Sequence, residues 1–192
     1  MPDVQGAQRF ELRDAVAADA SELAELTTAA WRTAYAEILP EGFLGAMDVS
    51  AREERLRERI SDPGLACFTI VAISGGRCVG FVSGGPARAT ADGGEVCAIY
   101  VAPDHCGRGF GRSLLGAAAA RLADAGYTQA RLWVFTRNRA ARRFYERCGW
   151  RAEAGRAYWR RDGLRRQLTC YSRSLAKGAR LDEARLETAI TR

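Results

Sequence analysis

The sequence predicts a single α/β domain built around a mixed sheet. Its 192 residues are the length of one ordinary domain, and the balance of 47% hydrophobic to 27% charged residues is that of a globular protein. The apolar spacing switches between strand and helix periods, in the order strand, two helices, three strands, helix, strand, helix and two strands. That order places strands and helices in one packed unit.

The first half of the chain is predicted to supply one strand, two helices and a hairpin. Residues 10–13 alternate between apolar and polar, which is typical of a strand. Apolar residues recur at helical spacing from residue 20 to about residue 40, and a second helix is expected over residues 50–60, with Ser50 as its N-cap. The hairpin joins two β-rich runs across a turn with two glycines, and these runs are residues 67–73 and 78–83.

The second half is predicted to alternate strands and helices before a closing hairpin. A strand over residues 96–101 is followed by a glycine-rich segment and by a helix over residues 111–125, whose leucines share one face. A strand over 131–135 and a helix over 138–147 come next. The closing hairpin pairs residues 150–159 with residues 167–174 across a turn at residues 161–163.

We expect the folded domain to span residues 9–175, between a leader of residues 1–8 and a polar tail of residues 176–192. No apolar run approaches the length of a membrane span. The first residues lack the basic and apolar regions of a secretory signal. The sequence therefore predicts a cytoplasmic protein with no membrane partner.

Charge is distributed unevenly along the chain. The net charge of +6 divides into −7 for residues 1–104, +7 for residues 105–150 and +6 for residues 151–192. The basic part favours an anionic ligand, and the acidic part is compatible with a cationic one. Nucleic acid is an alternative partner for the basic part, but its arginines are not interleaved with a recognisable nucleic-acid motif. We therefore expect no nucleic-acid partner.

Cysteine and histidine usage excludes several kinds of site. None of the six cysteines forms a C-x-x-C pair, which argues against zinc ribbons and thioredoxin-type sites. The single histidine, His105, leaves room for few zinc sites and for no Ser-His or Cys-His dyad that does not include it. We expect no metal and no covalent acyl-enzyme intermediate.

The most informative segment is the strand that runs into Gly107, Gly109 and Gly111 and then directly into a helix. Alternating glycines let the backbone turn tightly, and the first N–H groups of the helix then converge with its dipole behind them. A Walker loop needs a lysine that is absent, and the dinucleotide fingerprint would place its third glycine at Arg112 or Leu114. The segment suits a diphosphate cradle, and its alternative is a glycine turn that binds nothing.

The context of this segment resembles motif A of the GNAT superfamily, the coenzyme-A-dependent N-acetyltransferases. The similar pattern is strand-Pro-x-x-x-Gly-x-Gly-x-Gly-x-x-Leu-Leu, beginning at Pro103. A second block resembles the family downstream, from Gly126 through Leu132-Trp133-Val134 to Trp150, and residues 31–40 are similar to the first helix of many bacterial members. The resemblance covers residues 9–175 in element order.

The resemblance implies a fold and a co-substrate. The fold would be a mixed, mostly antiparallel sheet of about seven strands, with helices on both faces and splayed central strands that hold coenzyme A. Acetyl-CoA would lie along one strand through its pantetheine arm and on the glycine segment through its pyrophosphate. Cys106 departs from the Gln or Arg that the family prefers there. The cofactor-binding residues would be Ile99, Tyr100, Val101, Gly107, Arg108, Gly109, Phe110, Gly111, Arg112, Ser113, Asn138, Ala141 and Tyr145.

Two residues are the predicted catalysts. Tyr145 matches the family's tyrosine that protonates the departing thiolate, and its alternative is a core side chain, since its helical face is apolar. Glu95 opens the strand that would carry the thioester, about four residues before Ile99, and is the candidate base for the amine. Its alternative is an exposed acid at a strand end. A backbone N–H near Ile99 would meet the oxyanion.

The acceptor side is the least defined by sequence. Trp31, Tyr35 and Phe43 are candidates for the acceptor pocket, with helix core as the alternative. The predicted function is direct acetyl transfer from acetyl-CoA to a primary amine of a small molecule or a protein N-terminus, by a monomer or a homodimer. The rival hypothesis is a non-catalytic acyl-CoA-binding regulatory module, which would need neither Tyr145 nor Glu95.

Overall fold

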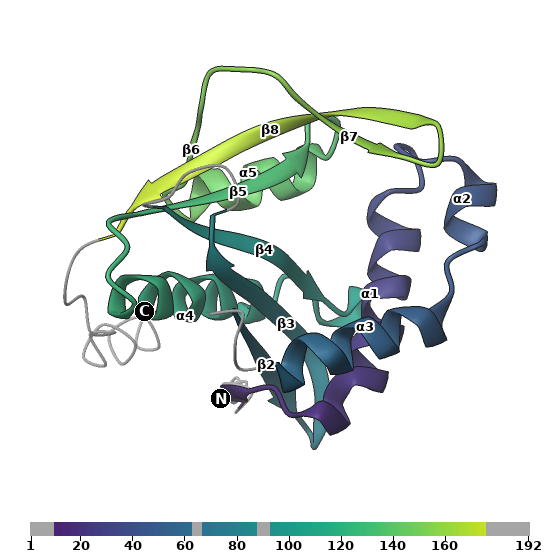
Figure 1. Cartoon of the computed structure of the whole chain (residues 1–192), viewed down its shortest axis with the longest axis horizontal. Coiled ribbons are helices and arrows are strands. Elements are labelled where there is room, and N and C mark those ends of the chain that lie inside the picture. The colour runs from purple at the N-terminus through teal and green to yellow at the C-terminus, as the bar shows by residue number, and fades with distance from the viewer. Residues whose placement is uncertain (1–9, 63–66, 88–92, 176–192) are drawn as a thin grey trace, which may run out of the picture.

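The computed structural model describes residues 10–62, 67–87 and 93–175. Within these ranges the chain forms one eight-stranded mixed sheet with helices on both of its faces (Figure 1). The predicted leader of residues 1–8 and the predicted tail of residues 176–192 lie outside the described residues. None of the helices in the described ranges is long and apolar enough to cross a membrane.

The first half of the chain forms β1 to β3 and three helices. These elements are β1 (Glu11–Asp14), α1 (Ala20–Ala34), α2 (Glu41–Gly45), α3 (Val49–Ser61), β2 (Phe68–Ser74) and β3 (Arg77–Pro86). The helix expected up to Pro40 ends earlier, and α2 is an additional short helix. The N-cap of α3 is Asp48 rather than Ser50, because the Asp48 carboxylate accepts a hydrogen bond from the Ala51 N–H at 3.0 Å.

The second half forms the remaining strands around two helices. They are β4 (Gly94–Val101), α4 (Phe110–Asp124), β5 (Gln129–Phe135), α5 (Arg139–Arg147), β6 (Arg151–Ala152), β7 (Ala157–Arg161) and β8 (Leu164–Ser174). The strand expected over residues 150–159 is wrong as one element. It divides into β6 and β7 around Gly155, whose φ of 124° interrupts an extended strand, so the sheet has eight strands instead of about seven.

The strand order is β1-β2-β3-β4-β5-β8-β6, with β7 paired to the far part of β8. All neighbours are antiparallel except β4 and β5, which are parallel. Their ladder covers only three pairs, from Gly94–Ala130 to Val96–Leu132. Beyond Val96 the two strands diverge, so the expected splay of the central strands is present.

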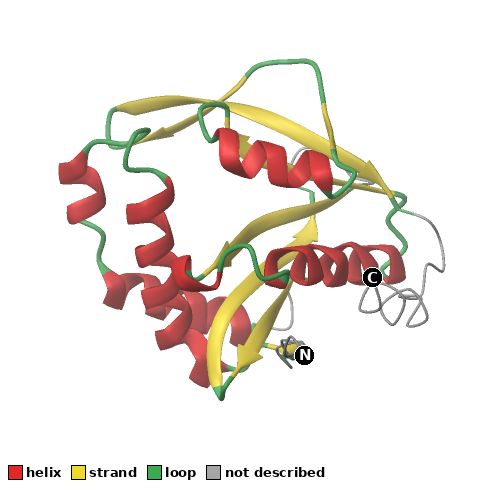
Figure 2. Cartoon of the chain, turned by 180° about the vertical axis from the view of Figure 1, so that it is seen from behind, coloured by secondary structure: helices red, strands yellow, loops and turns green. Residues whose placement is uncertain are grey.

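Two hydrophobic layers enclose the sheet. Leu114, Leu115 and Leu122 of α4 are buried against β2 to β5, in a core that also takes Tyr145 from α5. The opposite face packs Leu23 and other residues of α1 against β2 and β3, with α3 behind them. Seen from behind, α4 and α5 lie on the same side of the sheet, away from the group of α1 to α3 (Figure 2). The predicted helices on both faces are therefore confirmed.

Candidate active site

Two adjoining cavities follow the splay between β4 and β5. The first has a volume of about 220 Å³ and lies between these strands and the end of α1. The second, of about 440 Å³, lies between β4, the glycine segment and α5. The residues common to both are Ile99, Val101, Cys106, Ala141 and Tyr145. Because these five residues line both, the two cavities adjoin, one beside the glycine segment and the other beside the end of α1.

A β-bulge in β4 decides which side chains face this path. The pairing of β3 with β4 shifts between Ser83 and Gly84, so that Cys97 is the extra residue in β4. Val96 before the bulge and Ile99 after it both pack into the α4 core, although they are three residues apart. Ala98 and Tyr100 pack on the α1 face. The stretch from Cys97 to Val101 thus borders the first cavity, and no register pair joins its residues from Ala98 onward to β5.

The glycine segment has the backbone that the sequence predicts. Gly107 and Gly109 adopt φ values of 80° and 92°, in the left-handed region that glycine tolerates, and Gly109 is the N-cap of α4. A Cβ on Gly111 would lie 3.3 Å from the Phe144 ring, so glycine also allows close packing there. Gly107, Gly109, Gly111 and Arg112 line the second cavity. The first N–H groups of α4, which precede the hydrogen bonds within the helix, therefore lie beside that cavity.

Not every residue predicted for the cradle faces a cavity. The Phe110 side chain is 1% exposed and packs against Phe10 and His105. Ser113 and Arg112 line a third cavity of about 480 Å³ on the outer side of α4, which continues from the second through Arg112, Arg147 and Cys148. Arg173 completes a group of three arginines there. Sequence reasoning missed Arg147 and Arg173, which belong to separate elements.

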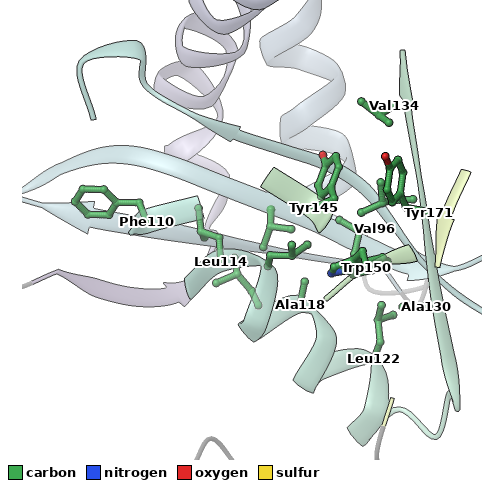
Figure 3. Close-up of a cluster of buried hydrophobic side chains, with 14 of the residues drawn as sticks. Val96, Phe110, Leu114, Ala118, Leu122, Ala130, Val134, Tyr145, Trp150 and Tyr171 are labelled. Atoms are coloured by element: carbon green, nitrogen blue, oxygen red, sulfur yellow. The ribbon is translucent and has the colours of Figure 1, made fainter. Parts of the chain in front are cut away.

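Tyr145 has a buried ring in a position shared by both cavities. Its side chain is 8% exposed, and its ring lies beside that of Tyr171, with both hydroxyls pointing the same way (Figure 3). Tyr171 donates to Glu146 at 2.6 Å and accepts from Arg142 at 3.2 Å. No described residue hydrogen-bonds to the Tyr145 hydroxyl. Burial, and then Tyr100 and Cys148, raise the pKa of Tyr145, which keeps its proton in place.

Asn138 both shapes α5 and lines the first cavity. Its Oδ1 accepts the Ala141 N–H at 3.1 Å, which caps the helix. The side-chain NH₂ group remains as a donor at the cavity wall. The cap also fixes the first turn of α5, on which Ala141 and Tyr145 depend for their positions.

The three aromatic residues predicted for the acceptor side have different places. Tyr35 lines the first cavity and packs edge-on against Phe135, with ring centroids 4.9 Å apart. Trp31 does not line the first cavity itself, but its Nε1 donates a hydrogen bond at 2.8 Å to the hydroxyl of Tyr100, which does. Phe43 packs on Trp159 in a hydrophobic cluster and does not line either cavity. Burial raises the pKa of both Tyr35 and Tyr100.

Glu95 lies before the bulge and is not among the residues that line the two cavities. Its neighbour Val96 faces the α4 core, so the Glu95 side chain is on the α1 face of the sheet. Its register partner in β5 is Arg131, whose Nε lies 3.5 Å from Glu153. Glu95 stands two residues before Cys97 in β4, and Cys97 does line the first cavity.

Trp133 is a site residue that sequence reasoning missed. It lines the first cavity and keeps 40% of its surface exposed. The alternation of Leu132, Trp133 and Val134 was a usable signal, because two buried neighbours place the tryptophan on the opposite face. Sequence alone does not reveal that this face borders the splay. Among the described residues, no group of three or more His, Cys, Asp or Glu side chains is placed to hold a metal ion.

Comparison with known sequences identifies related proteins. The model of the acetyltransferase (GNAT) family matches residues 25–150. YuaI of Bacillus subtilis, an uncharacterized N-acetyltransferase, is 30% identical over 129 residues, which cover 66% of this chain and 72% of YuaI. The residues that match the family model contain β4, the glycine segment, α4, β5 and α5.

Solved structures share the architecture. The PaiA N-acetyltransferase of Thermoplasma acidophilum, solved in complex with coenzyme A, aligns with a TM-score of 0.69 at 22% identity, over 84% of this chain and 98% of that one. YncA of Salmonella typhimurium, solved with its cofactor acetyl-CoA, aligns with a TM-score of 0.67 at 22% identity, over 90% and 98%. At these identities the likeness establishes the fold.

Proposed function

Because the chain belongs to the GNAT family of acetyltransferases, we propose that it transfers an acetyl group from acetyl-CoA to a primary amine of a small molecule or of a protein N-terminus. The observation that carries the proposal is the path of two adjoining cavities along the splay. One end of the path meets the start of α4, and Tyr145 lines the stretch that both cavities share.

The residues present fit acetyl-CoA at each point of this path. From Ala98 to Val101 no register pair joins β4 to β5, so the N–H and C=O groups of this stretch can pair with the amides of a pantetheine arm. The glycine segment and the N-terminus of α4 suit a pyrophosphate. Arg112, Arg147 and Arg173 suit the remaining phosphate charge at the third cavity. Cys106 lines both cavities but leaves this backbone cradle intact.

The chemistry that we propose is direct attack without an acyl-enzyme intermediate. Acetyl-CoA supplies an activated thioester, and the amine nitrogen forms a bond to its carbonyl carbon while the C–S bond breaks. A backbone N–H near Ile99 would donate to the oxygen as negative charge develops on it. The amine proton would pass to Glu95 through water, since Glu95 does not line the cavity itself.

Tyr145 is proposed to act on the leaving sulfur. Its pKa is raised above that of an ordinary phenol, whereas an ordinary thiol has a pKa near ~8.5. Complete proton transfer from this phenol to the thiolate is therefore uphill. We infer that Tyr145 donates a hydrogen bond that strengthens as charge accumulates on sulfur, and that the thiolate takes its proton finally from solvent.

Calorimetric titration tests the binding step. The purified protein would be titrated with acetyl-CoA, with desulfo-coenzyme A and with NAD as the control nucleotide. We expect the first two to bind and NAD not to bind. Absence of acetyl-CoA binding would refute the proposed function. Release of free thiol is then followed with a panel of primary amines. If acetyl-CoA binds but none of the amines causes thiol release, the regulatory module is favoured over the enzyme.

A further inference from the structure

Trp133 is exposed in an unusual place. The exposed large apolar side chains of the described residues are Phe10, Val16 and Trp133. Trp133 is the one that lies on an interior strand, since β5 is flanked by β4 and β8. Leaving about 40% of an indole in water forgoes a substantial hydrophobic gain. A ring kept at a cavity wall in this way is available to a ligand.

The neighbours of Trp133 define the environment of that ring. Phe135, two residues on, packs with Tyr35 at the end of α1, so both β5 side chains lie on the α1 face. Arg131, two residues before, pairs with Glu153. Glu95 lies beside Arg131 on the same face. The positive charge nearest to Trp133 along the strand, that of Arg131, is thus paired with Glu153. The Glu95 carboxylate also lies beside Arg131.

The first cavity offers a cation no charged partner among its walls. Its described lining consists of apolar side chains together with tyrosine and threonine hydroxyls, two thiols and the Asn138 amide. An ammonium group inside it would be met by hydroxyl oxygens and by ring faces. Indole is the best ring for attracting a cation, and the attraction grows when the site excludes water. An anionic group would find no arginine, lysine or histidine side chain in this lining.

We infer that Trp133 is the docking surface of an ammonium-bearing acceptor, whose positive charge lies against the indole face beside the splay. The inference rests on the proposed function, because it names the acceptor class of the same site. Tyr145 and Ile99 line the same cavity, so an amine docked on Trp133 needs little movement to reach the thioester. Glu95 on the same face would then receive the proton that the ammonium must lose.

A binding experiment that needs no turnover tests this inference. The probes are choline and its neutral isostere, in which carbon replaces the nitrogen. Both would be titrated by ligand-observed NMR into the protein, once without coenzyme A and once with coenzyme A in excess. Choline is expected to bind about threefold to thirtyfold more tightly than the isostere, as a cation–π contact predicts. In Trp133→Leu the preference should vanish, and in Trp133→Phe, which keeps a ring, part of it should remain.

The control variant is Tyr158→Leu. Tyr158 is an aromatic residue of β7 covered by Arg165, 3.6 Å from its ring centroid, and it lines neither cavity. It should keep the full preference for choline. Equal binding of the two probes, no binding of choline, or a preference that survives Trp133→Leu would overturn the inference.

The outcome is separable from that of the proposed function. Acetyl-CoA binding to the wild-type protein tests the proposed function, and the preference for choline over its isostere tests the cation site, so each proposal has its own readout. Suppose that acetyl-CoA fails to bind, while the wild-type protein binds choline more tightly than the isostere and Trp133→Leu does not. The enzyme proposal then falls and the cation site stands. If thiol release proceeds normally and choline shows no preference, the cation site falls and the enzyme proposal stands.

Discussion

Replacing Tyr145 by phenylalanine separates catalysis from stability. The substitution removes one hydroxyl from a ring that is 8% exposed, and no described residue loses a hydrogen bond with it. The free energy of unfolding should therefore change by less than about 0.5 kcal/mol. In the transition state the lost interaction is a hydrogen bond to a developing thiolate, worth about 1.5 to 3 kcal/mol.

That energy translates into a loss of kcat of about tenfold to 150-fold, since about 1.36 kcal/mol is one factor of ten. The assay is free-thiol release at saturating acetyl-CoA, with the KM for acetyl-CoA and the melting temperature measured in parallel. We expect both of these to stay close to the wild-type values. Because the pKa of Tyr145 is raised, its hydroxyl remains protonated through neutral and mildly alkaline pH, so the fold loss should be constant there.

Tyr171→Phe is the matched control, because the two rings are neighbours with centroids 5.8 Å apart. The Tyr171 hydroxyl bonds Glu146 and Arg142 and lines neither cavity. This variant should lose about 1 kcal/mol of stability and keep its kcat within about threefold. A kcat for Tyr145→Phe within about threefold of wild type would refute the role of the hydroxyl.

Three further substitutions test the cradle, an ion pair and the bulge. Gly109→Ala forces a Cβ into φ 92°, which should cost about 1 to 2 kcal/mol of stability and weaken acetyl-CoA binding by calorimetry; unchanged binding would contradict the cradle. The Arg13 guanidinium holds the pKa of Asp19 below its usual range, so the charged pair stabilises the fold above the unfolded pKa near ~3.9 and ceases to do so as pH falls through the lowered value. Asp19→Asn should therefore cost about 2 kcal/mol at neutral pH and progressively less in acid, whereas a pH-independent cost by denaturant titration would refute the pairing. Gly84→Ala would place a Cβ 2.8 Å from the Glu95 carbonyl oxygen and should destabilise the fold by more than about 2 kcal/mol. A denaturant midpoint equal to that of the wild type would show that the close approach of β3 to β4 at the bulge is not required.

The local backbone around the candidate site was predictable from sequence. A strand that enters alternating glycines and then a helix has few conformations, and the structure begins α4 at Phe110, one residue before the predicted start. The start of α5 was predictable for the same reason, because Asn138 precedes the helix and its short side chain accepts the Ala141 N–H of the first turn. Tyr145 follows from the register of that helix.

Shorter or competing signals were not decisive. The helix α2 has five residues, too few to display a helical period, and the sequence pattern could not reveal it. Asp48 and Ser50 are both good caps, and Ser50 has the more complete motif with Glu53. The chain nevertheless starts the helix one residue earlier, with Asp48 bonded to Ala51.

Tertiary arrangement accounts for the remaining differences. Trp150 was placed in a strand, but β6 begins at Arg151, and Trp150 is buried in the α4 core at 2% exposure. The remainder of the predicted strand is interrupted at Gly155. The role of Trp133 depends on where β4 and β5 diverge, and divergence leaves no mark in the residues of either strand alone. The bulge at Cys97 likewise emerges only from pairing with β3.

The short parallel ladder has a consequence for how the protein melts. Only three residue pairs of β4 and β5 join β1–β4 to the strands that follow, and the path of the two cavities crosses this seam between β4 and α5. A ligand seated there spans both sides and binds the folded state alone. At one hundred times its dissociation constant it would add about 2.7 kcal/mol to the unfolding free energy. Amide hydrogens along the seam should then exchange with solvent more slowly, so the resistance of the chain to unfolding would follow the concentration of its own co-substrate.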